Sequence, residues 1–243
     1  MSESVQTSRI TSGMIMSLHL AEVSPGKAMS ALRSGPVPAQ HEGLHWASTF
    51  LMSPLRADSA MFDVKPSGAA LLAAWDNDEA LDRYLSHSSA AAYDNGFRAR
   101  FEPVRTIGAW PGLLELPRRE IPMDDHPVGV LTLARVRMNK MVPFVAAASH
   151  AERDAAHHPA FLEGTSLIKP PNRVATFSLW RSVKEMRQYT VGSYPGGHVR
   201  AMKRHDESDF HHETIFVRLR PYAVDGHWNG RNPLDMLKPL TTN

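Results

Sequence analysis

Apolar residues along the chain follow patterns that predict the same order of strands and helices twice. Strands are expected where apolar residues alternate or run together, and helices where they recur every three or four positions. In the first half the predicted strands are 14–23, 43–52, 69–75 and 97–109, and the predicted helices are 26–33 and 78–93. This order is βαββαβ.

The second half repeats the order with one helical segment more. Its predicted strands are 128–138, 161–169, 174–180 and 213–220, and its predicted helical segments are 140–153, 183–191 and 198–207. A βαββαβ unit is ferredoxin-like, with an antiparallel sheet and both helices on one face. Two such sheets can pack face to face within one chain, so we expect an α+β protein made of tandem ferredoxin-like repeats that form an intrachain pseudo-dimer.

A repeated sequence motif supports this duplication. The first copy consists of Arg100, Pro103, Gly108, Trp110 and Gly112. The second copy has the same residue types at the same spacing, namely Arg218, Pro221, Gly226, Trp228 and Gly230. Before each copy, a predicted strand ends in a tryptophan, Trp75 or Trp180, and enters a helix. Matched motifs at one spacing indicate an internal repeat.

The motif also sets the expected domain boundaries. We predict a disordered N-terminal tail over 1–13, a first repeat over 14–112, a proline-rich linker over 113–127 and a second repeat over 128–243. Between tryptophan and arginine the first repeat has 25 positions and the second has 38. The second repeat therefore carries about thirteen extra residues around its second helix, where we expect the functional site.

Composition narrows the chemistry. Hydrophobic residues make up 42% and charged residues 21% of the 243 residues, which is ordinary for a globular protein. The chain has no cysteine, so disulfides, iron–sulfur clusters and thiolate ligands are excluded. With 27 basic and 25 acidic residues, nucleic acid is not an expected partner. No apolar run reaches the roughly eighteen residues of a membrane span, and we expect a cytoplasmic protein.

The extra stretch contains a helix break that ends in a histidine. It runs from Gly192 to His198, and Gly196 and Gly197 remove side chains beside the histidine. Glycines allow a flat molecule to approach the backbone closely. This stretch is therefore a candidate cofactor site.

Several of these residues together resemble the spheroidene monooxygenase family, whose members oxidise carotenoids. The resemblance rests on 174–180, Met186, Gly197-His198, Glu213, Phe216, Arg218 and 226–230, and in the first half on Leu44-His45-Trp46 and 70–75. It implies a dimeric α/β barrel and bound haem. The chain differs from the family at Phe210-His211-His212 and at Thr214, so the implied substrate is an apolar organic molecule and not specifically a carotenoid.

The resemblance and the residues together suggest how haem b would be held. His198, at the start of a predicted helix, is the expected axial ligand of the iron, with Gly197 beside it. Arg218 is a candidate partner of a haem propionate, although its equivalence to Arg100 also favours a structural role. Phe177 is a candidate cavity-lining residue.

Other histidines are expected to be less important. His205 lies seven residues beyond His198, about 10 Å along a helix, and is expected in solvent. His211 and His212 are adjacent on a predicted strand, so their side chains should point to opposite faces, and we expect a surface role for both.

The leading functional hypothesis is a haem-dependent monooxygenase, an oxidoreductase that receives electrons from a separate ferredoxin or reductase. One alternative is a haem-dependent dehydratase or lyase similar to the aldoxime dehydratases. Another is a haem-free barrel that binds an apolar ligand. No glycine-rich phosphate loop or serine-hydrolase motif is present, and both a monomer and a homodimer are compatible with the duplication.

Overall fold

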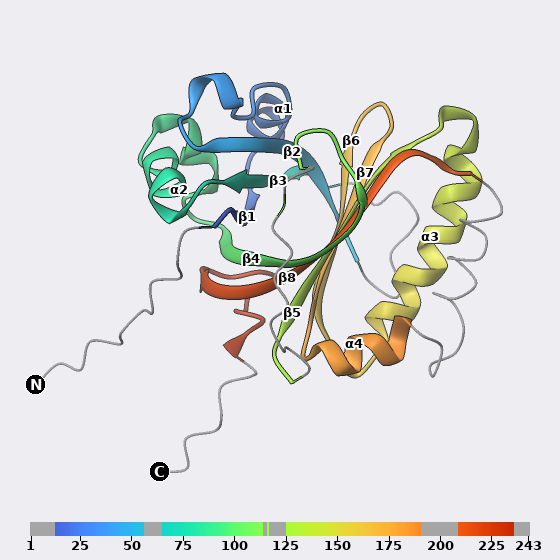
Figure 1. The fold of residues 1–243 in the computed structure, drawn as a ribbon. Helices are drawn as coiled ribbons and strands as arrows, with labels where there is room; N and C mark the ends of the chain where they lie inside the picture. Colours follow the sequence, from blue (N-terminus) through green and yellow to red (C-terminus); the bar gives the residue numbers. More distant parts are fainter. Residues whose placement is uncertain (1–12, 56–64, 114–115, 117–124, 191–208, 236–243) are drawn as a thin grey trace, which may run out of the picture.

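In the computed structural model, which describes residues 13–55, 65–113, 116, 125–190 and 209–235, eight strands form a closed barrel. Every neighbouring pair of strands is antiparallel, and the order around the barrel is β1-β3-β2-β6-β7-β5-β8-β4. The first-half strands and the second-half strands lie as two steeply crossed groups (Figure 1). The fold class expected from the sequence is confirmed.

The element order of both halves also agrees with the prediction. The first half consists of β1 (Ile15–Glu22), α1 (Pro25–Arg33), a 3₁₀ turn η1 (Pro38–Gln40), β2 (Leu44–Pro54), β3 (Lys65–Trp75), α2 (Asp78–Leu85), η2 (Ser88–Tyr93) and β4 (Phe97–Ala109). The second half consists of β5 (Val128–Val136), η3 (Met138–Lys140), α3 (Met141–Ala156), β6 (Phe161–Lys169), β7 (Arg173–Trp180), α4 (Val183–Thr190) and β8 (His211–Asp225).

Two predicted elements differ most from the structure, and one is not described by it. The helix predicted over 78–93 ends at Leu85, because the Ser86 hydroxyl donates to the Arg83 carbonyl (2.8 Å) and a 3₁₀ turn follows from Ser88. The strand predicted over 213–220 is longer at both ends, since β8 pairs with β4 over its whole second part. The helical segment predicted over 198–207 lies outside the described residues.

The two halves are related by an approximate two-fold arrangement. Each half has the ferredoxin-like strand order, and the halves join where β2 pairs with β6 and where β4 pairs with β8. The second join is long, from Arg98 opposite Asp225 to Ala109 opposite Thr214. As a result, the last strand of each half extends under the helices of the other half.

The repeated glycines and tryptophans occupy equivalent positions in this arrangement. Gly108 and Gly226 have φ of 85° and 76°, a region that favours glycine. A side chain on either would meet a backbone oxygen of the segment that it faces, the Thr214 oxygen at 2.4 Å and the Gly96 oxygen at 2.1 Å respectively. Trp110 and Trp228 are 5% and 4% exposed and close the same interior core. The repeated motif therefore lies at the two ends of the β4–β8 pair.

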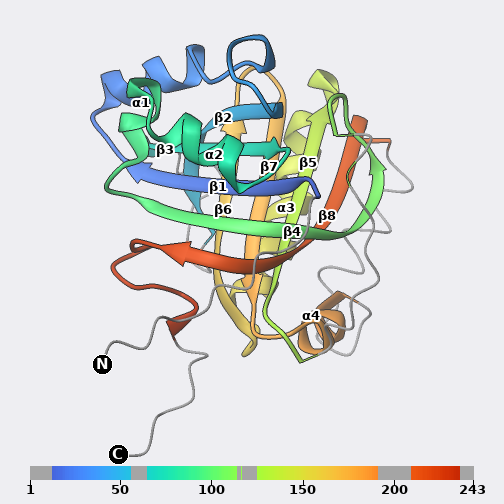
Figure 2. The ribbon, with the colours of Figure 1, turned by 60° about the vertical axis from the view of Figure 1, so that its left-hand side comes forward.

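Three apolar cores hold the elements together. One fills the barrel and includes Phe50, Phe97 and Phe101. The second lies between the first-half strands and α1 and α2, and the third between the second-half strands and α3 and α4. Figure 2 shows α1 and α2 over β1 and β3, with α3 on the far side of the barrel. Of the predicted linker, the described Leu113 and Leu116 belong to the interior core.

Candidate functional site

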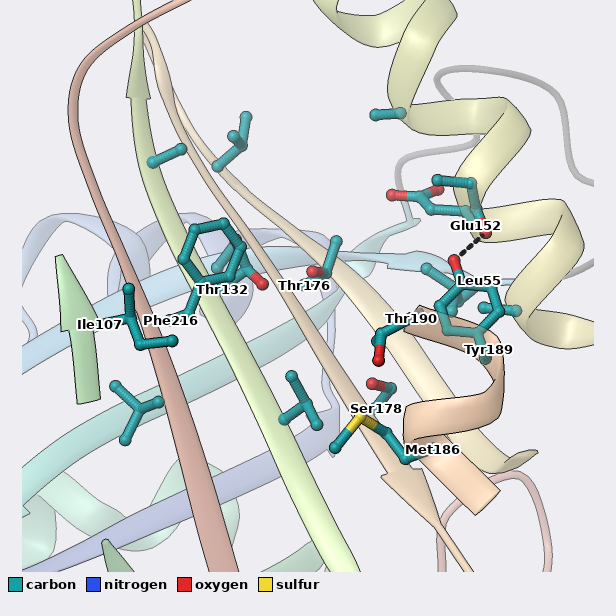
Figure 3. Close-up of a pocket in the computed structure, with 18 of the residues that line it drawn as sticks. Leu55, Ile107, Thr132, Glu152, Thr176, Ser178, Met186, Tyr189, Thr190 and Phe216 are labelled. Atoms are coloured by element: carbon teal, nitrogen blue, oxygen red, sulfur yellow. Dashed lines mark hydrogen bonds between the residues drawn. The ribbon is translucent and has the colours of Figure 1, made fainter. Parts of the chain in front are cut away.

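A pocket of about 450 Å³ lies in the second half, between the outer face of the sheet and helices α3 and α4 (Figure 3). Small-molecule sites usually measure roughly 300–1,000 Å³. The lining is largely apolar, and it includes residues of β4, β5, β7 and β8 as well as both helices. The pocket therefore draws on the last strand of the first half in addition to the second half.

Residues of neighbouring strands form rows across the floor of this pocket. Directly opposed residues in antiparallel strands point to the same face. The central row is Ile107, Phe216, Thr132, Thr176 and Ser166, on β4, β8, β5, β7 and β6 in turn. The row beside it is Arg105, Arg218, Val130, Ser178 and Gly164. Figure 3 shows Thr132, Thr176 and Ser178 rising from these strands.

The wall opposite this floor is one face of α3. Its lining residues are spaced as on one side of a helix, and they are Phe144, Ala147, Ala148, Ala151, Glu152 and Ala155. The alanines leave open the space that longer side chains would fill. Tyr189 of α4 donates a hydrogen bond to the Ala151 carbonyl (2.8 Å) and stacks on Trp180 with ring centroids 5.0 Å apart. These contacts fix α4 against α3 at the side of the pocket.

Glu152 is the acidic residue of the described pocket lining. Its Oε1 accepts a hydrogen bond from the Ser166 hydroxyl at 2.6 Å. Burial raises the pKa of this carboxyl, and the hydrogen bond from Ser166 opposes the rise only in part. The pocket thus contains a carboxyl that retains its proton to a higher pH than usual.

Two arginines lie together at the opposite edge of the floor. Arg105 on β4 and Arg218 on β8 are direct cross-strand partners, and both line the pocket. Three strand spacings of about 4.8 Å separate β8 from β6, so the nearer arginine, Arg218, lies about 14 Å around the sheet from the strand of Ser166. Guanidinium groups bind carboxylates in a bidentate manner. One edge of the pocket can therefore accept an anionic group.

A β-bulge brings His211 into the same pocket. Arg135 of β5 is opposite Glu213, but its neighbour Val136 is opposite His211, so His212 is an extra residue in β8. A bulge of this kind re-aims side chains. His211 is half-buried and packs edge-on against Phe144 with ring centroids 5.0 Å apart, whereas His212 is exposed and contacts Arg137.

The corresponding face of the first half is filled. By the strand pairings of Trp75 and Trp180, His19 corresponds to Thr132 and Leu71 to Thr176. Both His19 and Leu71 are fully buried, and the His19 ring lies 6.0 Å from the Tyr93 ring. Larger side chains thus occupy in one half the space that threonines leave open in the other. This asymmetry places the pocket in the second half.

The candidate site residues that the structure describes, Arg218 and Phe177, lie in different parts of the fold. Arg218 lines the pocket, whereas its counterpart Arg100 forms ion pairs with Asp78 (2.7 Å) and Asp82. Phe177 is 0% exposed and belongs to the barrel interior, in contact with Phe101 and Trp228.

The remaining histidine predictions have different outcomes. His198, Gly197 and His205 lie outside the described residues, so their predicted roles stay predictions. The surface role expected for His211 is wrong, because the bulge directs it into the pocket. His212 is exposed, in agreement with the surface role expected for it.

The described residues contain neither a metal-binding group nor a membrane-spanning helix. Within 13–55, 65–113, 116, 125–190 and 209–235, no three His, Asp or Glu residues come together as a metal-binding group. In the same ranges, no helix combines the length and the apolar character that crossing a membrane requires.

Comparison with known proteins gives two similar sequences. Spheroidene monooxygenase of Rubrivivax gelatinosus is 28% identical over 178 residues, which cover 70% of this chain and 67% of that protein. Spheroidene monooxygenase of Rhodobacter capsulatus is 24% identical over 136 residues, covering 55% of this chain and 56% of that protein. The match thus spans about two thirds of the first relative and little more than half of the second. No protein-family model matches the chain.

Comparison with solved structures supports the fold. A crystal structure of aldoxime dehydratase aligns with a TM-score of 0.52 at 9% identity, over 90% of this chain and 83% of that chain. The predicted resemblance to spheroidene monooxygenases is confirmed, and so is the barrel that it implied. The names of both relatives support the predicted class of enzyme, an oxidoreductase of the monooxygenase type.

Proposed function

We propose that this chain is a haem-dependent monooxygenase of an apolar organic substrate and that the second-half pocket is its active site. The observation that carries the proposal is the composition of this pocket: an apolar space of about 450 Å³ with an arginine pair at one edge. Apolar walls suit a macrocycle, and guanidinium groups suit propionates. The names of the two similar proteins support the same type of reaction.

Within this proposal, His198 would bind the haem iron, and Gly197, the preceding residue in the sequence, would leave room for the macrocycle. Thr190 and Phe210, on either side of 191–208, both line the pocket, which supports a ligand from this stretch. Arg218 and Arg105 would pair with the propionates, and Phe177 would support the floor from inside the barrel. When bound, haem b would supply the activation of dioxygen, with electrons from a separate ferredoxin or reductase in the cytoplasm.

The chain's own residues would bind and orient the substrate. Ala147, Ala148 and Ala151 provide a smooth apolar wall, and Thr132 and Thr176 provide hydroxyls on the floor. Tyr189 and Trp180 close one side and exclude water from it. Such a site binds an apolar molecule by removing it from water and fixes its orientation with a few polar groups.

Absorption spectroscopy of the purified protein tests the proposal. We expect a Soret band that is lost or shifted in His198→Ala and retained, with at most a small shift, in His211→Ala. A band that is lost only in His211→Ala would transfer the ligand role to His211. The absence of any band after haem addition would refute haem dependence and leave a ligand-binding barrel.

The requirement for dioxygen separates the monooxygenase from the alternative enzyme class. We expect product formation only when dioxygen and a reductant are both supplied. Turnover under strict anaerobiosis would instead indicate a haem-dependent dehydratase or lyase, whose fold this chain shares.

A further inference from the structure

Glu152 differs chemically from everything around it in the pocket. Its neighbours on the same helix face are alanines, and the arginines of the described lining, Arg105 and Arg218, lie at the far edge of the floor. Figure 3 shows Glu152 projecting from α3 above the strands that carry Thr132 and Thr176. An isolated carboxyl in an apolar pocket is costly to desolvate, so it indicates a use.

The contacts of Glu152 leave one of its oxygens for a ligand. Ser166 donates to Oε1 at 2.6 Å, and among the described residues no lysine or arginine forms an ion pair with this carboxyl. Burial favours the uncharged form. A protonated carboxyl is a hydrogen-bond donor as well as an acceptor. In its protonated form the group can accept from Ser166 and donate into the pocket at the same time.

We propose that Glu152 orients the substrate of this pocket by donating a hydrogen bond from its carboxyl O–H to an uncharged acceptor oxygen, such as that of a ketone, aldehyde or ether. The inference rests on the proposed function only in taking the pocket as the substrate site. The substrate class then becomes an apolar molecule that carries one oxygen acceptor, placed at the β6 side of the floor.

The energetics explain why the acceptor matters. A pure hydrocarbon bound in the pocket would leave the Glu152 O–H shielded from water without a partner, and an unsatisfied buried donor is penalised. A carbonyl oxygen in the same place satisfies it. Selectivity for oxygenated over purely hydrocarbon ligands therefore follows from this one side chain.

Acetophenone and α-methylstyrene test the inference, because they have the same shape and differ in C=O against C=CH₂. Their dissociation constants are measured by calorimetry on the wild-type protein and on Glu152→Leu. We expect the preference for acetophenone to fall by about three- to ten-fold in Glu152→Leu, which is the factor that one neutral hydrogen bond provides.

Two further variants control for folding and for charge. Glu152→Gln keeps the shape and retains a donor, so it should preserve part of the ketone preference. Asp154→Asn makes the same chemical change on the same helix at a residue that does not line the pocket, and it should leave the preference unchanged.

The inference would be overturned if the wild type and Glu152→Leu showed the same preference for acetophenone over α-methylstyrene. It would also be overturned if the wild type showed no such preference. Absorption spectra of the same samples keep this result apart from the proposed function. A missing Soret band with a preference that depends on Glu152 would refute haem dependence alone, whereas an intact band with no such dependence would refute the role of Glu152 alone.

Discussion

Replacement of His19 should change the pH dependence of stability, because this side chain is buried without a hydrogen-bond partner. Its exposure is 1%, and among the described residues neither ring nitrogen has a partner. Burial, reinforced by the charges of Arg98 and Arg100, lowers the pKa of His19 from 6.5 to about 3. The folded protein therefore holds this imidazole neutral at pH values where the unfolded chain protonates it.

The sign and size of the effect follow from this difference. Below pH 6.5 the unfolded state binds a proton that the folded state does not, so the free energy of unfolding falls as the pH falls toward 3. Each pH unit contributes about 1.4 kcal/mol, which amounts to about 2 kcal/mol at pH 5. Well above pH 6.5 the imidazole is neutral in both states, so the wild type has the full free energy of unfolding there.

Urea unfolding of wild type and His19→Leu at pH 8 and pH 5 measures the effect. We expect the variant to gain about 2 kcal/mol relative to the wild type between the two pH values. His150→Leu, which removes an exposed histidine of α3, should show no such change. A difference between His19→Leu and wild type that stays constant with pH would refute the reasoning.

The other predictions concern packing, backbone conformation and the arginine pair. Phe177→Ala should lower the free energy of unfolding by about 3–5 kcal/mol, since Phe177 fills the barrel interior; a loss below about 1 kcal/mol in urea unfolding would contradict its placement there. Gly226→Ala should destabilise by about 1–3 kcal/mol, because its φ is 76° and the added carbon would meet the Gly96 oxygen. Gly26→Ala, with open space around it, should instead stabilise by about 0.4–1 kcal/mol in the same assay. Arg105→Met should lower the ratio of the affinity for haem to the affinity for haem dimethyl ester by up to about ten-fold, because the ester lacks the propionate charges. Spectral titration measures both affinities, and an unchanged ratio would contradict propionate binding at this edge.

Periodicity and the repeat were sufficient to predict most of the barrel. Along β7, Phe177 and Leu179 point into the interior while Thr176 and Ser178 face the pocket, as strict alternation requires. The paired motifs around Trp110 and Trp228 also indicated duplication correctly. These features are local or repeated, so the sequence alone contains them.

Not all pocket residues could be predicted from the sequence, because some reach the pocket through contacts that the alternation of apolar and polar residues does not determine. His211 reaches the pocket through the bulge at His212, which adds a residue without any local sequence signal. Arg105 belongs to the first repeat and becomes a pocket residue only because β4 pairs with β8 across the barrel. Glu152 could have been found, since helical spacing places it on one face with Ala148 and Ala155.

Titration of the protein with haem, followed by its Soret band, tests most directly whether the second-half pocket is the haem site. Thr176→Trp would place a large ring at the centre of the pocket floor, while Lys184→Trp would add the same ring on the exposed face of α4. We predict that the wild type and Lys184→Trp bind haem with equal affinity and that Thr176→Trp, folded by circular dichroism, binds at least about ten-fold more weakly. Unchanged haem binding by a folded Thr176→Trp would contradict the account.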